Sequence, residues 1–516
     1  MLNKSTLASF TRNDVYQEKS RTLMNSMQQR SEYDRAGRLQ TQLLLEGNFH
    51  EKVRLKREYH YDKIGQLVGV SDSTRGDALY RYDPLGRIVR AATPVFDETF
   101  SFDPASNITT TIPADRQSST LPADVPAVVG NVLREYAGIH FEYDAQGNMV
   151  TAFTWNAFSQ LESVQSAREG ASDVVATYYY DAFGRRIGKQ VAKGENDPAP
   201  VRVIYGWDGE NLAFESILGQ ECAKHYLYEF ESFVPLAQYL SPAIGNAWSE
   251  ASVGAVRDVA FFHCDHIGTP RELFDESQQK IWTGDYRFWG KLRQANASGS
   301  TDAPDYAHNN IRFQGQYYDS ETGLHYNRYR YYDPDTGRYI RQDPIGLFGG
   351  INLYLYGPSS TMWIDPFGLA MWPSGQFNSW FNGQTAEQIA DFMGSKSTRE
   401  LIKKALRGSG GMHEWFPVSM AAKAKELGLN AETLKSWATP TVDVYFQNIN
   451  DKGNIIQGPH PSRNSSGCRA SSVAHEQLMA QLQDAADPDE ALDIIQSFAR
   501  QFARNGASQT GGFRVL

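Results

Sequence analysis

The sequence predicts a multidomain protein, in which a long all-β part built from repeated hairpins precedes a small α+β domain that is mostly helical. Two observations carry this prediction. A short phrase of an aromatic residue, an aspartate and a glycine recurs through residues 1–369, and such repetition indicates stacked structural units. Tyrosine then almost disappears, since 26 of the 27 tyrosines precede residue 370. We therefore expect two parts of different character that join near residue 369.

Length and charge set limits on the function. The 516 residues correspond to about three domains of average size. The formal net charge of −10 argues against an electrostatic grip of the whole protein on nucleic acid. This charge lies entirely in residues 1–369, which hold 36 basic and 46 acidic side chains, because residues 370–516 hold 14 of each.

Targeting and cysteine signals are weak. Three scattered cysteines exclude a disulfide framework and a zinc site made of CxxC pairs. No stretch approaches the roughly 18 apolar residues of a membrane span, and the first residues lack the apolar core of a signal peptide. We therefore expect a soluble chain without a recognisable export signal.

The repeated phrase predicts hairpins. Its copies read EYDRAGR, HYDKIGQ, RYDPLGR, EYDAQGN and YYDAFGR, with a degenerate copy FSFDPASN, and they contain Asp34, Asp62, Asp83, Asp144, Asp181 and Asp103 respectively. Alternating, aromatic-rich residues flank each polar centre, which is typical of a strand, a tight turn and a second strand. Asp and Gly suit the demanding positions of such turns. We therefore interpret these aspartates as turn residues and not as metal ligands or catalytic groups.

The repeats, together with RFQGQYYDSETGLHYNRYRYYDPDTGRYIRQDPIGLFGGINLYLYGPSSTMWIDPFGL at 312–369, resemble the Rhs, or YD-repeat, proteins and their core domain. The resemblance implies an all-β YD-repeat shell at 1–311, a core with self-cleavage motifs at 312–369 and a variable toxin domain at 370–516. In this family the shell is hollow and encloses the C-terminal polypeptide. The shell part is short here, so the chain is a fragment, a compact version, or one of two chains that complete a shell.

The core segment contains two D-P-x-G-L motifs, whose aspartates Asp343 and Asp365 lie 22 positions apart. By themselves such motifs indicate turns. The resemblance implies in addition that the core cuts its own chain between Leu369 and Ala370, by chemistry similar to that of an aspartic protease. Two neighbouring carboxylates share a proton, so one can act as a base on water while the other protonates the carbonyl or the leaving amine. We predict Asp343 and Asp365 as this pair.

Two arginines precede the first motif. Arg338 and Arg341 are candidates for holding the first carboxylate in its ionised form. The alternative is an exposed arginine pair at the end of a strand. The implied cut coincides with the change in tyrosine use and charge, an observation that does not depend on the resemblance.

The part after residue 369 reads as a small domain with several helices. We expect helices within 385–411, 418–429, 470–486 and 487–503, and a strand hairpin over 441–458 that turns at Asn450–Gly453. Because no helix is long and apolar, a pore-forming role is disfavoured.

Three histidines are the candidate functional residues of this domain. A lone histidine is more often structural, but His413 and His460 stand beside Gly-rich or Pro-rich loops, and His475 falls in a predicted helix. The phrase HEWFPVS, followed by a helix and KELGL, resembles the HH-x-x-P segment of HNH/endonuclease VII-like toxin nucleases. Glu414 stands where many of these nucleases have a second histidine.

The resemblance implies a metal-dependent nuclease. In such nucleases one imidazole takes a proton from water, and a divalent metal such as Mg²⁺ or Zn²⁺ stabilises the charge that develops on the phosphate. His413 is the candidate general base or ligand, and the substitution at Glu414 leaves this choice open. The candidate ligands and orienting groups are Glu414, His475, His460 and Asn448, and the candidate phosphate-binding residues are Arg463 and Arg469.

Two other functions stay open for residues 370–516. An ADP-ribosyltransferase-like toxin would use arginine, serine and glutamate, and Arg463, Ser465 and Ser466 match this loosely, but no clear E-x-E follows. A non-catalytic binding module released by the shell is the third possibility. The equal numbers of basic and acidic side chains lack the basic bias of many nucleases, although a local groove needs few basic residues.

The resemblance as a whole implies an antibacterial Rhs effector, cytoplasmic in the producer and then injected into the cytoplasm of a target cell. The implied partners are a type VI secretion spike protein for delivery, a cognate immunity protein, and nucleic acid as the substrate of the toxin. We expect no membrane partner.

Overall fold

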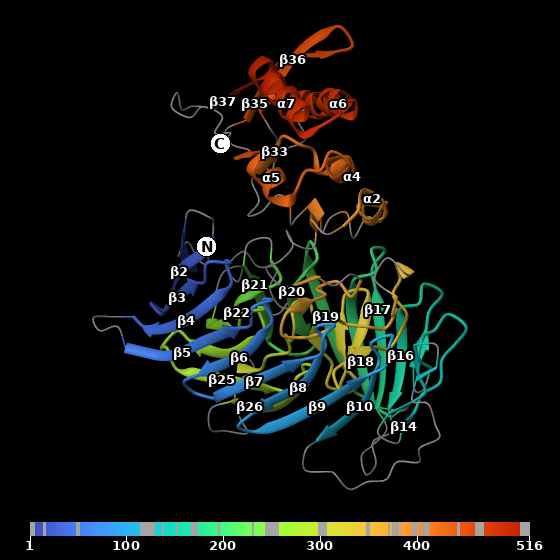
Figure 1. Ribbon diagram of the computed structural model, residues 1–516. Helices are drawn as coiled ribbons and strands as arrows, with labels where there is room; N and C mark the ends of the chain where they lie inside the picture. The colour runs from blue at the N-terminus through green and yellow to red at the C-terminus, as the bar shows by residue number, and fades with distance from the viewer. Residues whose placement is uncertain are drawn as a thin grey trace. The chain divides into compact units, whose positions relative to one another are not determined.

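The computed structural model divides into two compact units, Met1–Gly375 and Gln376–Leu516 (Figure 1). The structure describes residues 6–13, 17–47, 52–113, 128–129, 131–136, 139–150, 153–166, 174–194, 197–229, 232–242, 257–297, 307–346, 351–369, 372–373, 381–382, 384–394, 399, 402–403, 406, 412–440, 444–459 and 469–505. Within these residues, no helix has both the length and the apolar character needed to cross a membrane.

The first unit contains two long antiparallel meanders, in which sequence neighbours pair (Figure 1). The first sheet has ten strands: β1 Ala8–Arg12, β2 Glu18–Leu23, β3 Gln28–Tyr33, β4 Leu39–Glu46, β5 Lys52–Tyr61, β6 Leu67–Asp72, β7 Gly76–Tyr82, β8 Ile88–Thr93, β9 Phe96–Phe102 and β10 Ile108–Pro113. The second has twelve: β15 Phe153–Trp155, β16 Leu161–Ser166, β17 Val174–Tyr180, β18 Arg186–Lys193, β19 Val201–Asp208, β20 Asn211–Ile217, β21 Cys222–Tyr228, β22 Pro235–Pro242, β23 Arg257–Cys264, β24 Pro270–Asp275, β25 Lys280–Tyr286 and β26 Leu292–Ala297.

Short strands complete this unit. The core segment forms a four-stranded sheet of β27 Tyr317–Tyr318, β28 His325–Asn327, β29 Arg330–Asp333 and β30 Arg338–Tyr339. Two-stranded pairs are β11 Val128–Val129 with β12 Val132–Leu133, β13 Glu135–Tyr136 with β14 Ile139–His140, and β31 Trp363–Ile364 with β32 Trp372–Pro373. Apolar side chains of β28 and β29 pack into one buried cluster with those of β16 and β17, so the core sheet lies against the second meander.

Each repeated phrase closes a hairpin through its aspartate. Asp83 Oδ1 accepts the N–H groups of Leu85 and Arg87, both at 2.9 Å, and its Oδ2 accepts Arg87 Nε at 2.7 Å. Gly86 has a φ of +77°, in the left-handed region that favours glycine. The bond from the amide four residues on recurs at Asp34, Asp62, Asp103, Asp144 and Asp181. The prediction that these aspartates act in turns is confirmed. The same bond at Asn13, Asn156, Asp265 and Asp275 marks turns that the sequence pattern missed.

In several copies the tyrosine of the phrase ties its hairpin to the one before it. Tyr61 OH donates to Leu39 O at 3.0 Å, and Tyr82 OH donates to Leu67 O at 2.7 Å. Each acceptor lies five residues after the aspartate of the preceding turn. Arg38 binds the carboxylate of Asp34, and its guanidinium carbon also lies 4.6 Å from the centroid of the Tyr61 ring. The repeat therefore encodes both the turn and its contact with the next hairpin.

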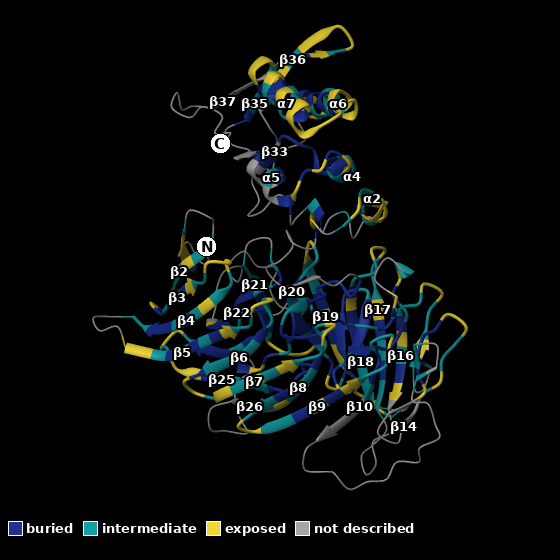
Figure 2. Cartoon of the chain, viewed as in Figure 1, coloured by how far each residue is buried: buried dark blue, intermediate teal, exposed yellow. Residues whose placement is uncertain are grey.

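The two meanders share a buried apolar cluster. Leu23, Leu44 and Leu55 of the first sheet pack with Leu236 and Phe261 of the second. Figure 2 shows the bands of buried and more exposed residues along the strands, as expected for sheets with one face turned to a core.

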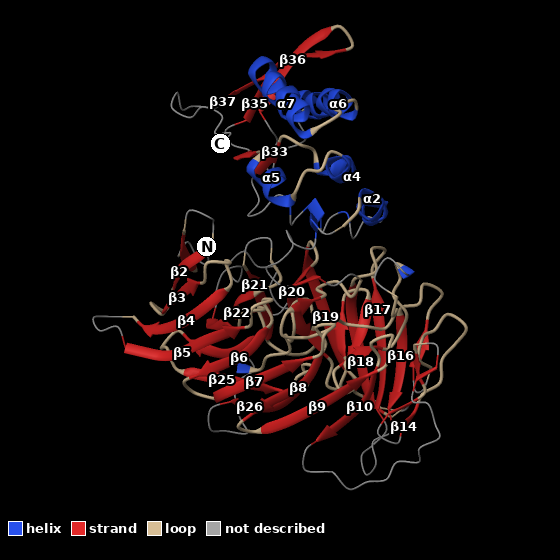
Figure 3. Cartoon of the chain, in the orientation of Figure 1, coloured by secondary structure: helices blue, strands red, loops and turns tan. Residues whose placement is uncertain are grey.

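The second unit holds most of the helical structure (Figure 3). Its helices are α2 Ala386–Gly394, η3 Val418–Met420, α4 Ala421–Glu426, α5 Ala431–Ser436, α6 Arg469–Gln483 and α7 Pro488–Phe502, and its strands are β33 Met412–Glu414, β34 Ala438–Pro440, β35 Val444–Asp451, β36 Asn454–Pro459 and β37 Ala503–Asn505. The predicted class, an all-β shell followed by a mostly helical α+β domain, is confirmed, and β35 and β36 form the predicted hairpin. The sequence pattern did not predict α5, β33, β34 and β37. The unit has its own buried core.

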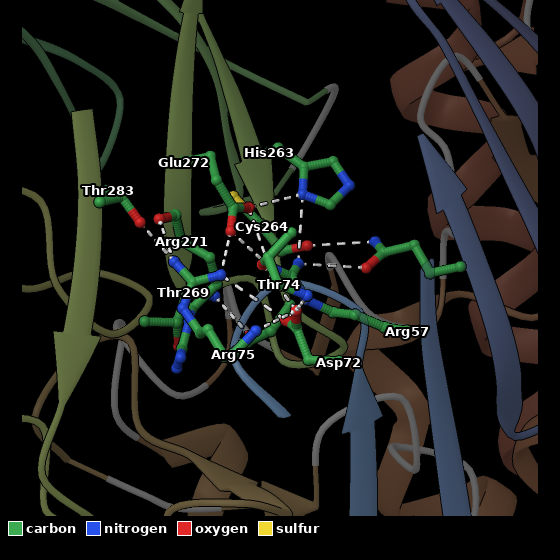
Figure 4. Close-up of polar contacts among 12 residues, drawn as sticks. Arg57, Asp72, Thr74, Arg75, His263, Cys264, Thr269, Arg271, Glu272 and Thr283 are labelled. Atoms are coloured by element: carbon green, nitrogen blue, oxygen red, sulfur yellow. Dashed lines mark hydrogen bonds and ion pairs between the residues drawn. The ribbon is translucent and has the colours of Figure 1, made fainter. Parts of the chain in front are cut away.

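A buried ionic cluster also bridges the two meanders (Figure 4). Arg57 of β5 donates to both carboxylate oxygens of Glu272 of β24, at 2.7 and 2.8 Å, and to Asp72 at 2.8 Å. Arg75 and His263 also contact Glu272. Burial alone would raise the pKa of Glu272, but the charge of Arg57 and the contacts with His263 and Arg75 hold it well below its ordinary value.

We expect Glu272→Ala to destabilise the first unit by about 3–5 kcal/mol, because the change leaves Arg57 and Arg75 without their shared buried carboxylate. The urea concentration at half-unfolding measures the effect. The matched control is Glu276→Ala, which removes an exposed carboxylate just after β24 and should cost less than about 0.5 kcal/mol. Equal midpoints for the two variants would contradict the role given to this cluster.

Candidate functional site

Both D-P-x-G-L motifs fold as turns related to those of the repeats. Asp343 Oδ1 accepts the N–H of Ile345 at 3.0 Å, and Asp365 Oδ1 accepts the N–H of Leu369 at 2.9 Å. The N–H of Gly368 bonds to Asp365 O at 3.3 Å. The prediction that the two motifs form turns is therefore confirmed. The turn hydrogen bonds use the Oδ1 atom of each aspartate.

The residue four positions after the aspartate distinguishes these motifs from the repeats. In the repeat at Asp83 this residue is Arg87, which binds the aspartate Oδ2. In the second D-P-x-G-L motif it is Leu369, an apolar residue that offers this oxygen no side-chain donor. Asp365 Oδ2 is thus available to partners from other strands.

Arg330 of β29 brings the two carboxylates together. Its Nη2 lies 3.0 Å from Asp343 Oδ2 and 3.1 Å from Asp365 Oδ2. The side chain of Arg330 is 2% exposed, and those of Asp343 and Asp365 are 3% and 1% exposed. The structure therefore places the two predicted aspartates on one guanidinium nitrogen in a site closed to bulk water.

The backbone that precedes the implied cut is held at this site. Arg330 Nε donates to Gly368 O at 2.5 Å, while Asp365 Oδ1 accepts the next N–H, that of Leu369. Gly368 has a φ of +67°, and a Cβ there would lie 2.7 Å from Asn327 O, so the position requires glycine. Leu369 is fixed beside the carboxylate pair, and Ala370 lies outside the described residues.

The electrostatics of the pair are asymmetric. Burial raises the pKa of Asp343 to about 7, although the charge of Arg330 and the Ile345 N–H favour its ionised form, and the neighbouring Asp365 adds to the rise. A carboxyl group with this pKa holds its proton over much of the neutral range. It can therefore serve as a general acid.

The raised pKa of Asp343 makes stability depend on pH. The folded chain binds this proton more tightly than the unfolded chain, so the contribution to stability is complete below about pH 4 and is lost as pH rises through about 7. We expect Asp343→Asn, which does not titrate, to gain stability relative to the parent between pH 4 and 7, by on the order of 3 kcal/mol. Unfolding midpoints across this range measure the difference. Because a backbone cut would add a titratable carboxyl group at Leu369 and a titratable amine at residue 370, both proteins carry Asp365→Asn, which prevents the proposed cut, and they differ only in Asp343→Asn. Parallel pH profiles of these two proteins would contradict the prediction.

The two arginines predicted from the sequence have different surroundings. Arg341 interacts with Asp343 through its charge, and burial followed by the like charge of Arg330 lowers the pKa of Arg341 to about 10. Arg338 instead donates to Asn131 O. The candidate role of Arg338 is therefore corrected: its side chain is directed to Asn131, and the arginine that binds the carboxylates is Arg330.

Sequence reasoning missed Arg330 and also Tyr339, whose OH donates to Asp365 Oδ2 at 2.9 Å. Arg330 stands in a run of arginines and tyrosines, RYRYYDPDTGRYIRQ, with no motif that separates it from its neighbours. The alternation of side chains along β29, where Arg330 and Tyr332 occupy the same face, is the signal that could have identified it.

The second unit places two of the predicted histidines side by side. The rings of His413 in β33 and His475 in α6 have centroids 4.9 Å apart. His413 is 1% exposed, with the Trp415 ring at 4.5 Å and the Phe446 ring at 5.6 Å. His475 Nδ1–H donates to Ser471 O at 2.7 Å, which leaves its Nε2 as the nitrogen not used in this bond. The pair therefore lies in an enclosed, aromatic environment.

The other candidates of this unit are not brought to the pair. Asn448 is exposed at an irregular position of β35, where it has a φ of +56°. The Phe446 ring of the same strand contacts both imidazoles, with centroids 5.6 Å from His413 and 6.0 Å from His475. The placement of Asn448 does not support it as an orienting group. Arg469 forms an exposed bidentate pair with Asp451. The side chain of Glu414, and the residues His460 and Arg463, lie outside the described residues.

A metal site is not assembled by the described residues, which contain no group of three or more His, Cys, Asp or Glu side chains suited to hold an ion. His413 and His475 supply two imidazoles. A metal at this place would require ligands in addition to these two imidazoles.

Comparison with known families agrees with the fold. Residues 4–208 match the family model described as teneurin YD-shell, and residues 259–296 match the model described as RHS protein. The chain belongs to the Rhs/YD-repeat family.

Curated relatives carry toxin names. The chain is 35% identical over 394 residues to the double-stranded DNA deaminase toxin A of Burkholderia cenocepacia, an alignment that covers 70% of this chain and 26% of that protein. It is 33% identical to the toxin protein Tse5 of Pseudomonas aeruginosa, over 64% of this chain and 28% of that protein. It is 30% identical to the probable deoxyribonuclease RhsA of Dickeya dadantii, over 69% and 24%. The chain spans about a quarter of the length of these relatives.

Solved structures share the fold at lower identity. The Tc holotoxin pore of Photorhabdus luminescens matches with a TM-score of 0.55 and 20% identity, over 70% of this chain and 19% of that chain. The complex of TcdB2 and TccC3 without the hypervariable C-terminal region matches with a TM-score of 0.54 and 20% identity, over 70% and 19%. These likenesses concern the fold alone.

Proposed function

We propose that this chain acts in an antibacterial Rhs effector, cuts itself between Leu369 and Ala370, and thereby detaches residues 370–516 as a toxin. The observation that carries the proposal is the position of Arg330, which holds Asp343 and Asp365 together beside Leu369. The toxin names of the curated relatives support the functional class.

The chemistry of the cut follows from two carboxylates in a dry site. One takes a proton from water as the water oxygen attacks the Leu369 carbonyl carbon, and the other gives a proton to the carbonyl oxygen or to the departing amine. Asp343 and Asp365 supply both functions, while Arg330 offsets their negative charge. The hydrogen bonds to Gly368 O and from Leu369 N–H hold the backbone in place during the reaction.

The detached fragment is proposed to be a nuclease of the HNH/endonuclease VII-like type. His413 and His475 form its centre, and a divalent metal would supply charge stabilisation at the phosphate. Support comes from the resemblance of the HEWFPVS segment and from the relative named as a probable deoxyribonuclease. Because residues 370–516 hold equal numbers of acidic and basic side chains, we expect nucleic acid to bind in a local groove and not over a broadly basic surface.

The proposed life cycle requires partners. We propose delivery by a type VI secretion spike protein, protection of the producer by a cognate immunity protein, and retention of the toxin by the YD shell until delivery. The toxin then acts in the cytoplasm of the target cell. If the shell encloses the toxin, the two fragments should elute together from a column under native conditions. Separate elution under these conditions would contradict enclosure.

One experiment tests both the cut and the toxin. Amino-terminal sequencing of the small fragment should read AMWPSG, which places the cut after Leu369. Residues 370–516, expressed alone because the unit has its own core, are then incubated with DNA, RNA and labelled NAD, with and without chelator. Degradation of nucleic acid that chelation abolishes supports the nuclease. Consumption of NAD that survives chelation identifies a transferase, and no reaction with any substrate indicates a binding module.

A further inference from the structure

Tyr339 distinguishes the two carboxylates of the pair. Three donors converge on Asp365: Tyr339 OH and Arg330 Nη2 reach Oδ2 at 2.9 and 3.1 Å, and the Leu369 N–H reaches Oδ1 at 2.9 Å. The described donors to the Asp343 carboxylate are Arg330 and the Ile345 N–H. The tyrosine hydroxyl is thus the additional donor on the Asp365 side.

Asn327 of β28 fixes the direction in which Tyr339 donates. Asn327 Nδ2 donates to Tyr339 OH at 2.6 Å and to Asp365 O at 2.8 Å. A hydroxyl group has one hydrogen, and because Asn327 occupies the oxygen as a donor, that hydrogen is directed to Asp365 Oδ2. The network therefore requires Asp365 Oδ2 to act as an acceptor.

The Tyr339 ring is held rigidly. It lies 3.6 Å from the Arg330 guanidinium carbon, and its centroid is 5.7 Å from that of Tyr332 and 6.1 Å from that of Tyr356. Burial, followed by the charge of Asp365, raises the pKa of Tyr339 well above its ordinary value, so the hydroxyl keeps its proton. Its position cannot change without moving several buried rings.

We propose that Tyr339, oriented by Asn327, is a positioning residue that selects Asp365 as the base and leaves Asp343 as the acid of the cleavage. This inference rests on the self-cleavage proposed above. It adds which carboxyl group accepts a proton and which one donates a proton.

The step balances with one water molecule. Asp365 takes a proton from water as the water oxygen bonds to the Leu369 carbonyl carbon. Asp343 gives its proton to the nitrogen of residue 370 as the carbon–nitrogen bond breaks. The new carboxyl group of Leu369 then gives its proton to the Asp343 carboxylate, and Asp365 passes its proton to the free amine, so that the products are one carboxylate and one ammonium group and both aspartates return to their starting forms.

Three titratable neighbours of the pair keep one charge state between pH 5 and 8. Arg341 remains cationic, with a pKa of about 10, and Tyr339 and Tyr356 remain neutral because burial raises the pKa of both hydroxyls. The alkaline limb of a pH–rate profile near pH 7 therefore reports Asp343.

The test compares Tyr339→Phe with Tyr332→Phe. Each change removes one buried hydroxyl from the same ring cluster, but Tyr332 OH donates to Trp289 O at 2.8 Å, away from the pair. Radiolabelled chain is made by a short cell-free translation, shifted to buffers from pH 4.5 to 9, and sampled for cleavage over time. We expect Tyr339→Phe to cleave about 10- to 100-fold more slowly, since a hydrogen bond to a charged group is lost.

The pH profile separates positioning from packing. In Tyr339→Phe the cleavage rate should fall at every pH while the alkaline limb set by Asp343 stays in place, because the lost hydroxyl contacts Asp365 and not Asp343. Tyr332→Phe should leave both the rate and this limb unchanged. Asn327→Ala should lower the rate in the same way without moving the limb, which provides a second variant if Tyr339→Phe folds poorly.

The outcomes distinguish this inference from the cleavage proposal. Unchanged cleavage in Tyr339→Phe, or movement of the alkaline limb alone, would overturn the assignment of base and acid while leaving the aspartate pair in place. If Asp343→Asn and Asp365→Asn are still cleaved, the proposed self-cleavage reaction itself is contradicted.

Discussion

We expect Asp343→Asn and Asp365→Asn each to leave the chain as one species of 516 residues, whereas the parent protein should separate into fragments of 369 and 147 residues on a denaturing gel. An amide can neither accept the proton of water nor act as a carboxylic acid, so each change removes one half of the acid–base pair. We expect cleavage to slow by about 10²- to 10⁴-fold or more. Both substitutions preserve side-chain volume, and the turn contacts of Oδ1 remain possible for asparagine.

The matched control for these variants is Asp335→Asn. Asp335 lies in the core segment, but its side chain is 52% exposed and pairs with Lys291. This variant should cleave like the parent. Two fragments in either Asp343→Asn or Asp365→Asn would show that the cut uses other residues.

His413→Asn is expected to abolish the toxicity of residues 370–516. If His413 is the base or a ligand of the proposed nuclease, its loss should reduce DNA or RNA cleavage by about 10²- to 10⁴-fold. Growth of cells that express the fragment and cleavage of plasmid DNA measure the effect.

The control for His413→Asn addresses packing. Trp415→Phe alters an aromatic neighbour whose ring lies 4.5 Å from the His413 ring, and it should retain most of the activity. Thermal unfolding of both variants shows whether the domain remains folded. Full toxicity of a folded His413→Asn protein would exclude this imidazole from the chemistry and favour another site or a binding module.

The repeat pattern was sufficient to predict the first unit because its signal is local. Aspartate, glycine and tyrosine each make contacts within one hairpin or with the next, as at Asp83 and Tyr82. Copies such as Asp265 escaped because the preceding residue is Cys264 in place of an aromatic residue, although the turn contacts are the same. The ionic bridge between Arg57 and Glu272 could not be predicted, since it joins residues 215 positions apart.

The candidate cleavage site was predicted in part. The paired motifs identified Asp343 and Asp365, but proximity in sequence suggested Arg338 and Arg341 as their partners. Arg341 does interact with Asp343 through its charge, but Arg338 does not bind the pair, and the pairing of short strands in the core sheet brings Arg330 and Tyr339 to the carboxylates. Sequence distance is a poor guide there, because residues on adjacent strands lie closer than residues a few positions along one strand.

The toxin site was the least predictable part. The HEWFPVS segment led to His413, and the structure places His475 beside it from α6. The burial of His413 among Trp415 and Phe446 was not foreseen, because the phrase suggested a loop and the structure has a short strand paired with β34.

Intact-mass spectrometry of the freshly made wild-type protein tests the central claim most directly. The account predicts two masses that together equal that of the 57.9 kDa chain plus one water, with the smaller species beginning at Ala370. A single unbroken mass under conditions in which the protein is folded would contradict the proposal that Asp343, Asp365 and Arg330 form a self-cleaving site.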